Sequence, residues 1–255
     1  MLLTIDIGNS HTVAGIFAGK ELRKSWRWRT ESRTTSDELT TFIAQLLSLA
    51  AMDRQEISET IMASVVPQVN QALVAACSEL FAVSPFIVDA TTDTGIKILT
   101  DNPNEVGADR LVNSVAAYQR YRAPLIVVDF GTATTFDCVS ATGEYLGGAI
   151  APGLAISLEA LRNKTAKLPR VDIRRPPARA LGTNTESAMA SGVIFGYSGL
   201  VQGLLQRLTA EMEKTPRVIA TGGMAALIAA HVPEIEEVDP MLTLEGLRLI
   251  HARNQ

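Results

Sequence analysis

Two stretches of the chain repeat the same order of apolar and polar positions. Residues 2–16 (LLTIDIGNSHTVAGI) run from an apolar segment through Asp6 and a glycine into a short polar loop and a second apolar segment. Residues 125–139 (LIVVDFGTATTFDCV) follow the same order around Asp129. The two aspartates are 123 positions apart, close to half of the 255 residues. We therefore predict two similar halves, residues 1–122 and 123–255, each opening with a β-hairpin.

Periodicity predicts the elements that complete each half. Trp26 and Trp28 alternate with arginines, the period of a half-buried strand. Thr35 followed by Glu38 forms a capping box ahead of an apolar helical stripe, so a helix should begin there. Further strands are predicted at residues 61–66, 86–88, 97–99, 145–150 and 218–220, and further helices at 67–80, 152–167, 185–213, 224–230 and 243–253. The segment 102–121 carries another helical stripe, which puts Asp109 and Arg110 in or near the first turn of its helix. This mixture of strands and helices predicts an α/β fold.

The composition narrows the class of protein. The chain is 47% hydrophobic and 20% charged, which is typical of soluble globular proteins. A net charge of −4 without a long basic run argues against nucleic acid as the main partner. Cys77 and Cys138 lack CxxC partners and sit among apolar residues, as buried thiols do in a reducing compartment. Without a basic leader or a run of ~18 uncharged apolar residues, we expect no membrane span and a cytoplasmic protein.

The two hairpins carry groups suited to phosphate and cations. The glycine in each turn lets the backbone approach a ligand closely. Hydroxyl and amide groups follow it, namely Asn9, Ser10 and Thr12 in the first hairpin and Thr132, Thr134 and Thr135 in the second. Asp6 and Asp129 supply negative charge, and Mg²⁺ is held by one or two carboxylates plus phosphate oxygens. One D-x-G motif is typically a turn after a strand, but two at matching places favour a ligand site.

A third glycine-containing turn lies in VIATGGMAAL, residues 218–227. A strand, a glycine pair and a helix start can accept a nucleotide, although the same pattern alone is often only a tight turn. The order of the three elements resembles the sugar kinase, Hsp70 and actin fold, in which ATP lies in the cleft between two ribonuclease-H-like halves. Neither a Walker A motif nor a G-x-G-x-x-G pattern after a strand occurs in the chain.

The segment GADR, residues 107–110, admits two interpretations. Asp109 and Arg110 are either a helix N-terminal acid with a neighbouring ion-pair partner, or a general base with an anion clamp. Residue chemistry alone does not separate these interpretations.

Six motifs together resemble the type III pantothenate kinases, the family that includes the proteins once described as Bvg accessory factors. They are DIGNS (6–10), SVVP (64–67), NPNEVGADR (102–110), DFGTATTFD (129–137), GGAIAPG (147–153) and GTNTESAMASG (182–192). The resemblance covers almost the whole chain. It implies ATP-dependent phosphorylation of pantothenate to 4'-phosphopantothenate, the first step of coenzyme A synthesis.

The resemblance also assigns roles to individual residues. The ATP phosphate loop would comprise Asp6, Ile7, Gly8, Asn9, Ser10, His11, Thr12 and Val13. Asp6 would lie near Mg²⁺, Thr132 would touch ATP, and Asp129 would hold a monovalent cation, K⁺ or NH₄⁺. Pantothenate would contact Gly107, Ala108, Asp109, Arg110 and Thr185. Asp109 would accept the hydroxyl proton during in-line transfer.

Members of the family are homodimers with pantothenate near the subunit interface, which suits the small residues that follow Thr185. Many members carry a tyrosine where this chain has Thr100, so one pantothenate contact differs here. Two alternatives stay open. One is another enzyme on the same fold, such as a sugar kinase or an exopolyphosphatase. The other is a non-catalytic regulator that binds ATP.

Overall fold

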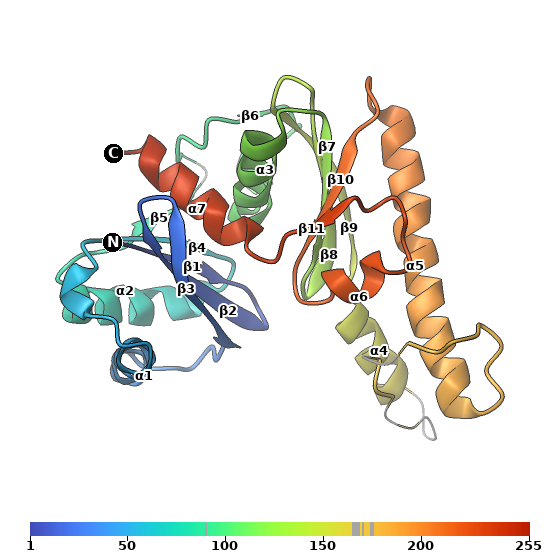
Figure 1. Ribbon diagram of the computed structural model, residues 1–255, viewed down its shortest axis with the longest axis horizontal. Coiled ribbons are helices and arrows are strands. Elements are labelled where there is room, and N and C mark those ends of the chain that lie inside the picture. The colour runs from blue at the N-terminus through green and yellow to red at the C-terminus, as the bar shows by residue number, and fades with distance from the viewer. Residues whose placement is uncertain (90, 165–168, 170, 174–175) are drawn as a thin grey trace. The chain divides into compact units, whose positions relative to one another are not determined.

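The structure is a computed structural model that describes residues 1–89, 91–164, 169, 171–173 and 176–255 (Figure 1). The chain forms two compact units. The first contains residues 1–96, 101–116 and 241–255, and the second contains residues 97–100 and 117–240. Neither unit is one continuous stretch, so the units differ from the predicted halves, residues 1–122 and 123–255.

The first unit is built on a five-stranded sheet with the order β3-β2-β1-β4-β5. The strands are β1 (Leu2–Ile7), β2 (His11–Ala18), β3 (Glu21–Arg29), β4 (Glu59–Ser64) and β5 (Phe86–Ile87). β1, β2 and β3 form an antiparallel meander, whereas β4 lies parallel to β1 and β5 lies parallel to β4. The predicted hairpin at the start of the chain is therefore confirmed.

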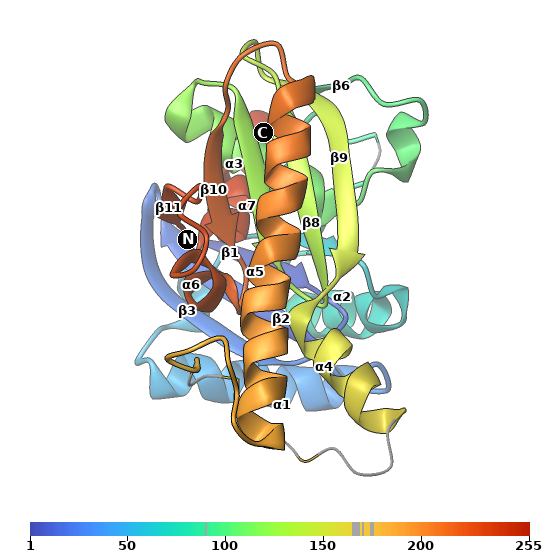
Figure 2. The same ribbon diagram turned by 90° about the vertical axis from the view of Figure 1, so that its right-hand side faces the viewer.

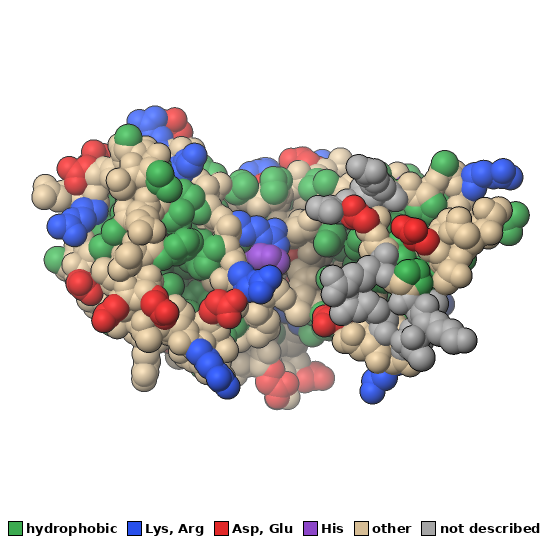
Figure 3. Space-filling model, turned by 90° about the horizontal axis from the view of Figure 1, so that it is seen from below, with side chains coloured by type: hydrophobic (Ala, Val, Ile, Leu, Met, Phe, Trp, Pro, Cys, Tyr) green, Lys and Arg blue, Asp and Glu red, His purple; other side chains and the backbone are tan. Residues whose placement is uncertain are grey.

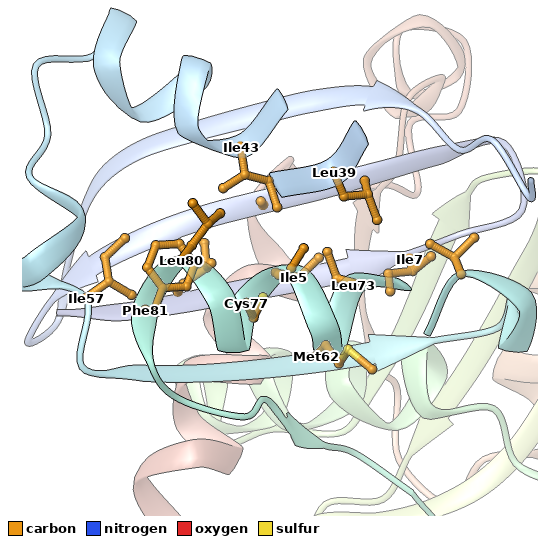
Figure 4. Close-up of a cluster of buried hydrophobic side chains, with 14 of the residues drawn as sticks. Ile5, Ile7, Leu39, Ile43, Ile57, Met62, Leu73, Cys77, Leu80 and Phe81 are labelled. Carbon is orange, nitrogen blue, oxygen red and sulfur yellow. The ribbon is translucent and has the colours of Figure 1, made fainter. Parts of the chain in front are cut away.

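Two helices, α1 (Ser36–Leu49) and α2 (Pro67–Phe81), cover one face of the first sheet (Figures 1 and 4). Ile5 and Ile7 of β1 pack there against Leu73 and Cys77 of α2 in the main core of the unit. The predicted capping box at the start of α1 is present, because Thr35 accepts from the Glu38 backbone N–H at 3.3 Å. Two short 3₁₀ turns, η1 (Arg54–Glu56) and η2 (Pro103–Glu105), complete the connections.

The last helix, α7 (Leu242–Arg253), belongs to the first unit although it closes the chain. Leu244, Leu247 and Ile250 pack in one cluster with residues of β1, β2 and β4. Gly246 allows α7 to come close to α3 (Ala108–Tyr121), since a Cβ there would lie 2.7 Å from Val112 Cγ1. An internal repeat read along the chain could not reveal this, because the helix returns across the repeat boundary.

The second unit repeats the strand order of the first. Its sheet has the order β11-β10-β7-β8-β9-β6, so β9-β8-β7-β10-β11 corresponds to β3-β2-β1-β4-β5 with the same relative directions. The strands are β6 (Lys97–Ile98), β7 (Leu125–Phe130), β8 (Ala133–Val139), β9 (Glu144–Pro152), β10 (Arg217–Thr221) and β11 (Glu237–Val238). β6 is an additional edge strand, and the two-residue β11 was too short for its pattern to predict.

Three helices complete the second unit, namely α4 (Leu154–Asn163), α5 (Thr185–Glu211) and α6 (Ala225–Ala229). α5 runs along the second sheet (Figure 2) and buries Ile194, Val201 and Leu205 in that core. The helix predicted at 152–167 falls in part outside the described residues. α3 contributes to both units, with residues up to Ala116 in the first.

α5 is also long and apolar enough to cross a membrane by length and composition. The core helices of globular proteins pass the same test, and 44% of its most apolar window is buried inside the fold. The stripe of α5 that packs on the second sheet gives those apolar residues a place in the core.

Candidate active site

The first hairpin presents a three-residue loop, Gly8 to Ser10, between β1 and β2. Asp6 pairs with Val13 and Ile7 pairs with Thr12, so the strands close directly beneath the loop. The Gly8 backbone N–H donates to the His11 carbonyl oxygen at 3.1 Å, and a Cβ at Gly8 would lie 3.1 Å from the same oxygen. The loop is therefore a tight turn that favours glycine at its first position.

The eight residues predicted to surround phosphate differ in what they expose. Asn9, Ser10 and His11 are exposed, and Asp6 is partly buried. Ile7 is buried in the core, so that residue offers only its backbone to a ligand. Thr12 is 3% exposed. Its hydroxyl lies 2.9 Å from the Thr30 hydroxyl, which makes Thr12 a support of the loop rather than a surface group.

Thr30 at the end of β3 braces this loop, and sequence reasoning missed it. Its hydroxyl donates to the Gly8 carbonyl oxygen at 2.7 Å, and its backbone N–H donates to the Ser10 carbonyl oxygen at 3.1 Å. Since the Thr30 proton goes to Gly8, the Thr12 hydroxyl donates to Thr30. No local pattern around residue 30 signals these bonds, because they depend on the pairing of β3 with β2.

Asp109 lies in the first turn of α3, in the same unit as the Asp6 loop. One carboxylate oxygen accepts from the Arg110 backbone N–H at 2.9 Å. Burial raises the pKa of Asp109, and the Arg110 N–H and charge oppose that shift without cancelling it. A Cβ at Gly107 would lie 2.6 Å from the same carboxylate oxygen, so glycine there leaves room for the acid. The arrangement can hold and move a proton at Asp109 Oδ1 or Oδ2.

The second hairpin is shorter at its tip than the first. Asp129 pairs with Thr135 and Phe130 pairs with Thr134, which leaves only Gly131 and Thr132 in the loop. Thr134 is fully buried, and its hydroxyl lies 2.6 Å from the Tyr197 hydroxyl of α5. Because Tyr197 donates to the Pro152 carbonyl oxygen at 2.9 Å, Thr134 donates to Tyr197. The Tyr197 hydroxyl of α5 thus holds the second hairpin in place.

The glycine turn after β10 lies against the Asp129 carboxylate. Thr221 pairs with Asp129 in the parallel register, and Gly222 follows with φ of +93°. A Cβ at Gly222 would collide with the Asp129 carboxylate and lie 2.7 Å from the Phe130 backbone. This turn and the second hairpin therefore lie side by side within the unit. α6 has only five residues, so the turn itself, more than a helix dipole, must shape any ligand site there.

Thr185 begins α5 in the second unit. Asn184 caps the helix by accepting from the Ser187 backbone N–H at 2.8 Å, and Thr185 stays exposed. The residue lines a groove of about 950 Å³ between α4 and α5, together with Leu154, Tyr197 and Leu200. Thr185 and Thr132 thus belong to the second unit, whereas Asp6 and the segment 107–110 belong to the first.

The buried cysteine of the first core contributes no nucleophile. Burial raises the pKa of the Cys77 thiol to about 12, so it stays protonated at neutral pH.

Relatives of known name match the chain over almost its full length. A chain from Desulfatibacillum aliphaticivorans named type III pantothenate kinase is 53% identical over 253 residues, 99% of this chain and 98% of that one. One of the same name from Pelobacter propionicus is 50% identical over all 255 residues, and covers the whole of both chains.

Solved structures support the fold. A Campylobacter jejuni protein described as a Baf family transcriptional activator matches with a TM-score of 0.62 at 20% identity, over 99% of this chain and 98% of that one. A ROK family glucokinase from Streptomyces griseus, solved with glucose and AMPPNP, matches with a TM-score of 0.55 at 11% identity. The match covers 100% of this chain and 99% of that one. The predicted pair of ribonuclease-H-like units of the sugar kinase, Hsp70 and actin fold is thereby confirmed.

A family model agrees with these relatives. The model described as type III pantothenate kinase matches residues 2–207, a range that includes both hairpins, Asp109 and most of α5. With relatives about half identical over the full length, this match shows that the chain belongs to the type III pantothenate kinase family.

Proposed function

We propose that this protein is an ATP-dependent kinase that phosphorylates the primary hydroxyl of pantothenate, the entry step of coenzyme A synthesis. Its near full-length similarity to proteins named type III pantothenate kinase supports the substrate. Cys77 and Cys138 are buried and form no disulfide, which suits a reducing compartment such as the cytoplasm.

The burial and the raised pKa of Asp109 are the main support for phosphoryl transfer to a hydroxyl group. Partial burial raises its pKa, and a base with a raised pKa accepts a proton more readily than an ordinary aspartate. As the hydroxyl oxygen forms its bond to the γ-phosphorus, the bond from that phosphorus to the β–γ bridging oxygen breaks and ADP leaves with the electron pair. The hydroxyl proton goes to the Asp109 carboxylate.

Two further side chains would orient pantothenate. Arg110 follows Asp109 on the first turn of α3, and a guanidinium can bind a carboxylate such as that of pantothenate through two parallel hydrogen bonds. Gly107 and Ala108 would bring the backbone to the substrate, and Thr185 offers an exposed hydroxyl. Thr100 takes the place of the tyrosine found in many members, so a shorter side chain would face the substrate there.

The first hairpin would bind the phosphates of ATP through the loop from Gly8 to Ser10. Exposed Asn9 and Ser10 side chains and the loop N–H groups are donors of the kind that phosphate oxygens accept. Asp6 would hold Mg²⁺, which requires only one or two protein carboxylates when phosphate oxygens supply the other ligands. Among the described residues no group of three or more His, Cys, Asp or Glu side chains that could hold a metal occurs. Bound Mg²⁺ would neutralise charge on the phosphates.

The second hairpin would hold the monovalent cation and a second part of ATP. Asp129 provides a carboxylate beside the glycine turn, and oxygen donors of this kind suit hard cations such as K⁺. A bound K⁺ or NH₄⁺ would add positive charge near the phosphates. Thr132 at the hairpin tip would contact ATP.

We further infer that the protein is a homodimer that pairs through α5. Gly192, Gly196 and Gly199 are exposed at helical spacing, and a Cβ added at any of them would meet nothing within 4 Å. A second copy could approach the backbone closely along this stripe. Sedimentation should show a dimer that Gly199→Ala preserves and Gly199→Leu disrupts. A dimer unaffected by leucine there would contradict the pairing through α5.

The activity is tested by coupling ADP release to a spectrophotometric readout, with MgATP and with or without pantothenate. Release should depend on pantothenate and should not occur with glucose. Equal release without an acceptor would indicate a phosphohydrolase, and release with glucose would indicate a sugar kinase. Either result would overturn the proposed substrate.

A further inference from the structure

The end of β3 carries charged groups that the proposed reaction does not use. Arg27 and Arg29 are exposed on this edge strand. Trp26 and Trp28 point to the opposite face and pack on the main core of the first unit, where Trp28 makes an edge-to-face contact with Phe42 at 5.4 Å between ring centroids. The tryptophans anchor the strand and hold the arginine face outward.

The register of the sheet places Arg27 on the face that carries Asp6. Asp6 pairs with Val13, and Val13 pairs with Arg27. Residues directly opposite in neighbouring strands point to the same face. The Arg27 backbone is therefore two strand spacings from Asp6, roughly 10 Å, a distance that a long guanidinium side chain partly covers.

The Arg27 side chain contacts His11, the residue that directly follows the loop from Gly8 to Ser10. Its Nη2 lies 3.2 Å from Nδ1 of His11, which sits opposite Arg29 and directly follows the loop. A guanidinium can only donate, so this ring nitrogen accepts and is unprotonated. Burial lowers the pKa of His11, and the charges of Arg27 and Arg29 lower it further, in keeping with a positive potential at this end of the sheet.

Arg27 and Arg29 contact no acid in the part of the chain that the structure describes. Among the described residues, no ion pair joins Arg27 or Arg29 to a carboxylate, whereas Arg23 on the same strand pairs with Glu21 at 2.9 Å. Figure 3 shows Lys and Arg side chains exposed on one face of the molecule. Arginine side chains that form no ion pair with an acid, next to a loop of N–H and hydroxyl donors, attract phosphate groups.

Thr30 connects this strand end to the loop. It follows Arg29 directly, and its hydroxyl and backbone N–H hold the Gly8 and Ser10 carbonyl oxygens. The loop and the two arginines are therefore fixed in one frame, which a phosphate site requires.

We propose that β3 completes the triphosphate site. Arg27 and Arg29 bind the terminal phosphates of MgATP, and Thr30 is the positioning residue that sets the loop against them. The inference rests on the proposed function, since it takes the loop from Gly8 to Ser10 as the phosphate loop. Charged residues are also common on edge strands because they prevent sheets from pairing edge to edge, and the experiment separates the two roles.

Isothermal titration calorimetry of the full chain tests the arginines. R27Q and R29Q should each weaken MgATP binding about tenfold, and the double variant more, because each loses charged hydrogen bonds. Binding of AMP, which lacks the terminal phosphates, should stay unchanged. K24Q is the matched control, since it removes one exposed charge from the same strand, and it should bind MgATP as the unchanged protein does. A double variant within twofold of the unchanged protein would overturn the proposal.

Kinetics test the positioning role of Thr30. T30V removes both hydroxyl bonds at nearly constant size and should raise KM for ATP several-fold while KM for pantothenate stays constant. T30S should restore the ATP value. Equal changes in both KM values, or a T30S variant whose KM for ATP stays raised, would show that Thr30 only stabilises the fold and does not position the phosphate loop. If the unchanged protein lacks pantothenate-dependent ADP release but binds MgATP, the proposed function fails, and the calorimetry still decides the role of the arginines.

Discussion

The two hairpins share a strand order but differ in what supports them. β1 and β2 carry a three-residue loop that Thr30 braces from the third strand. β7 and β8 carry a two-residue loop that Tyr197 of α5 braces through Thr134. The repeat therefore fixes where each turn lies, whereas the contacts that support the two turns differ.

The turns that follow the fourth strands differ in the same way. After β10, Gly222 lies against the Asp129 carboxylate with φ of +93°. After β4, the corresponding turn contains no glycine, and the Val65 N–H donates to the Ile7 carbonyl oxygen at 3.0 Å before Pro67 starts α2. Of the two turns, only the one in the second unit brings a glycine backbone against its aspartate.

The largest effect should come from a residue in neither hairpin. Asp109→Asn removes the proton acceptor and should lower kcat by roughly 10²–10⁴-fold, as loss of a general base does. Steady-state ADP release with saturating MgATP and pantothenate measures it. Near-normal turnover would show that Asp109 is not the general base.

The stability of the same variant provides its control. Because the folded-state pKa of Asp109 is raised, the folded protein binds this proton more tightly than the unfolded chain does. The contribution of this group to stability is present below the unfolded pKa and is lost as pH rises through the folded pKa. At pH 7 the ionised carboxylate therefore costs stability, and urea unfolding should show Asp109→Asn to be at least as stable as the unchanged protein.

In the unchanged enzyme kcat/KM should fall when pH drops below the folded pKa of Asp109.

Gly222→Ala tests the feature that separates the second unit from the first. The left-handed backbone and the collision with the Phe130 backbone should together lower the free energy of unfolding by about 3 kcal/mol. Gly19→Ala is the matched control, since Gly19 has φ of +61° with nothing within 4 Å. It should cost only about 1 kcal/mol in the same urea titration. Equal costs would show that the close approach of Gly222 to Asp129 and Phe130 does not affect stability.

Exchange of potassium for sodium distinguishes the two aspartates. If Asp129 holds the monovalent cation, sodium should lower kcat roughly tenfold through weaker stabilisation of the transferring charge. Asp129→Asn should remove the difference between the salts, whereas Asp6→Asn should weaken the dependence on Mg²⁺. Activity that is indifferent to the salt would argue against the division of cations between the hairpins.

The smallest expected effect concerns the brace of the second hairpin. Tyr197→Phe removes the hydroxyl between Thr134 and Pro152 and should lower the free energy of unfolding by about 1 kcal/mol. Tyr118→Phe is the control, because its hydroxyl makes only a 3.4 Å contact with the Ala141 carbonyl oxygen. If both variants unfold at the same urea concentration, the contact from α5 does not stabilise the hairpin.

Local patterns in the sequence determined much of the architecture. Strand alternation and the D-x-G turns located both hairpins, and the Thr35–Glu38 pair located the start of α1, because these signals depend on neighbours along the chain. The same patterns identified the acids, since a carboxylate at a strand end or in a first helical turn is visible from spacing alone. The family followed from motifs of several residues each.

Tertiary structure decided what depends on residues far apart in the chain. α7 joins the first unit because its apolar stripe matches the free face of that sheet, a match that no local pattern encodes. Thr12 is a buried support and Thr30 a brace because strand register brings them together across 18 residues. Burial that raises the pKa of Asp109 likewise arises only when the chain is folded. The sequence by itself determined which chemical groups are present and which elements carry them, and packing decided their partners, since hydrogen bonds and desolvation depend on distance in space.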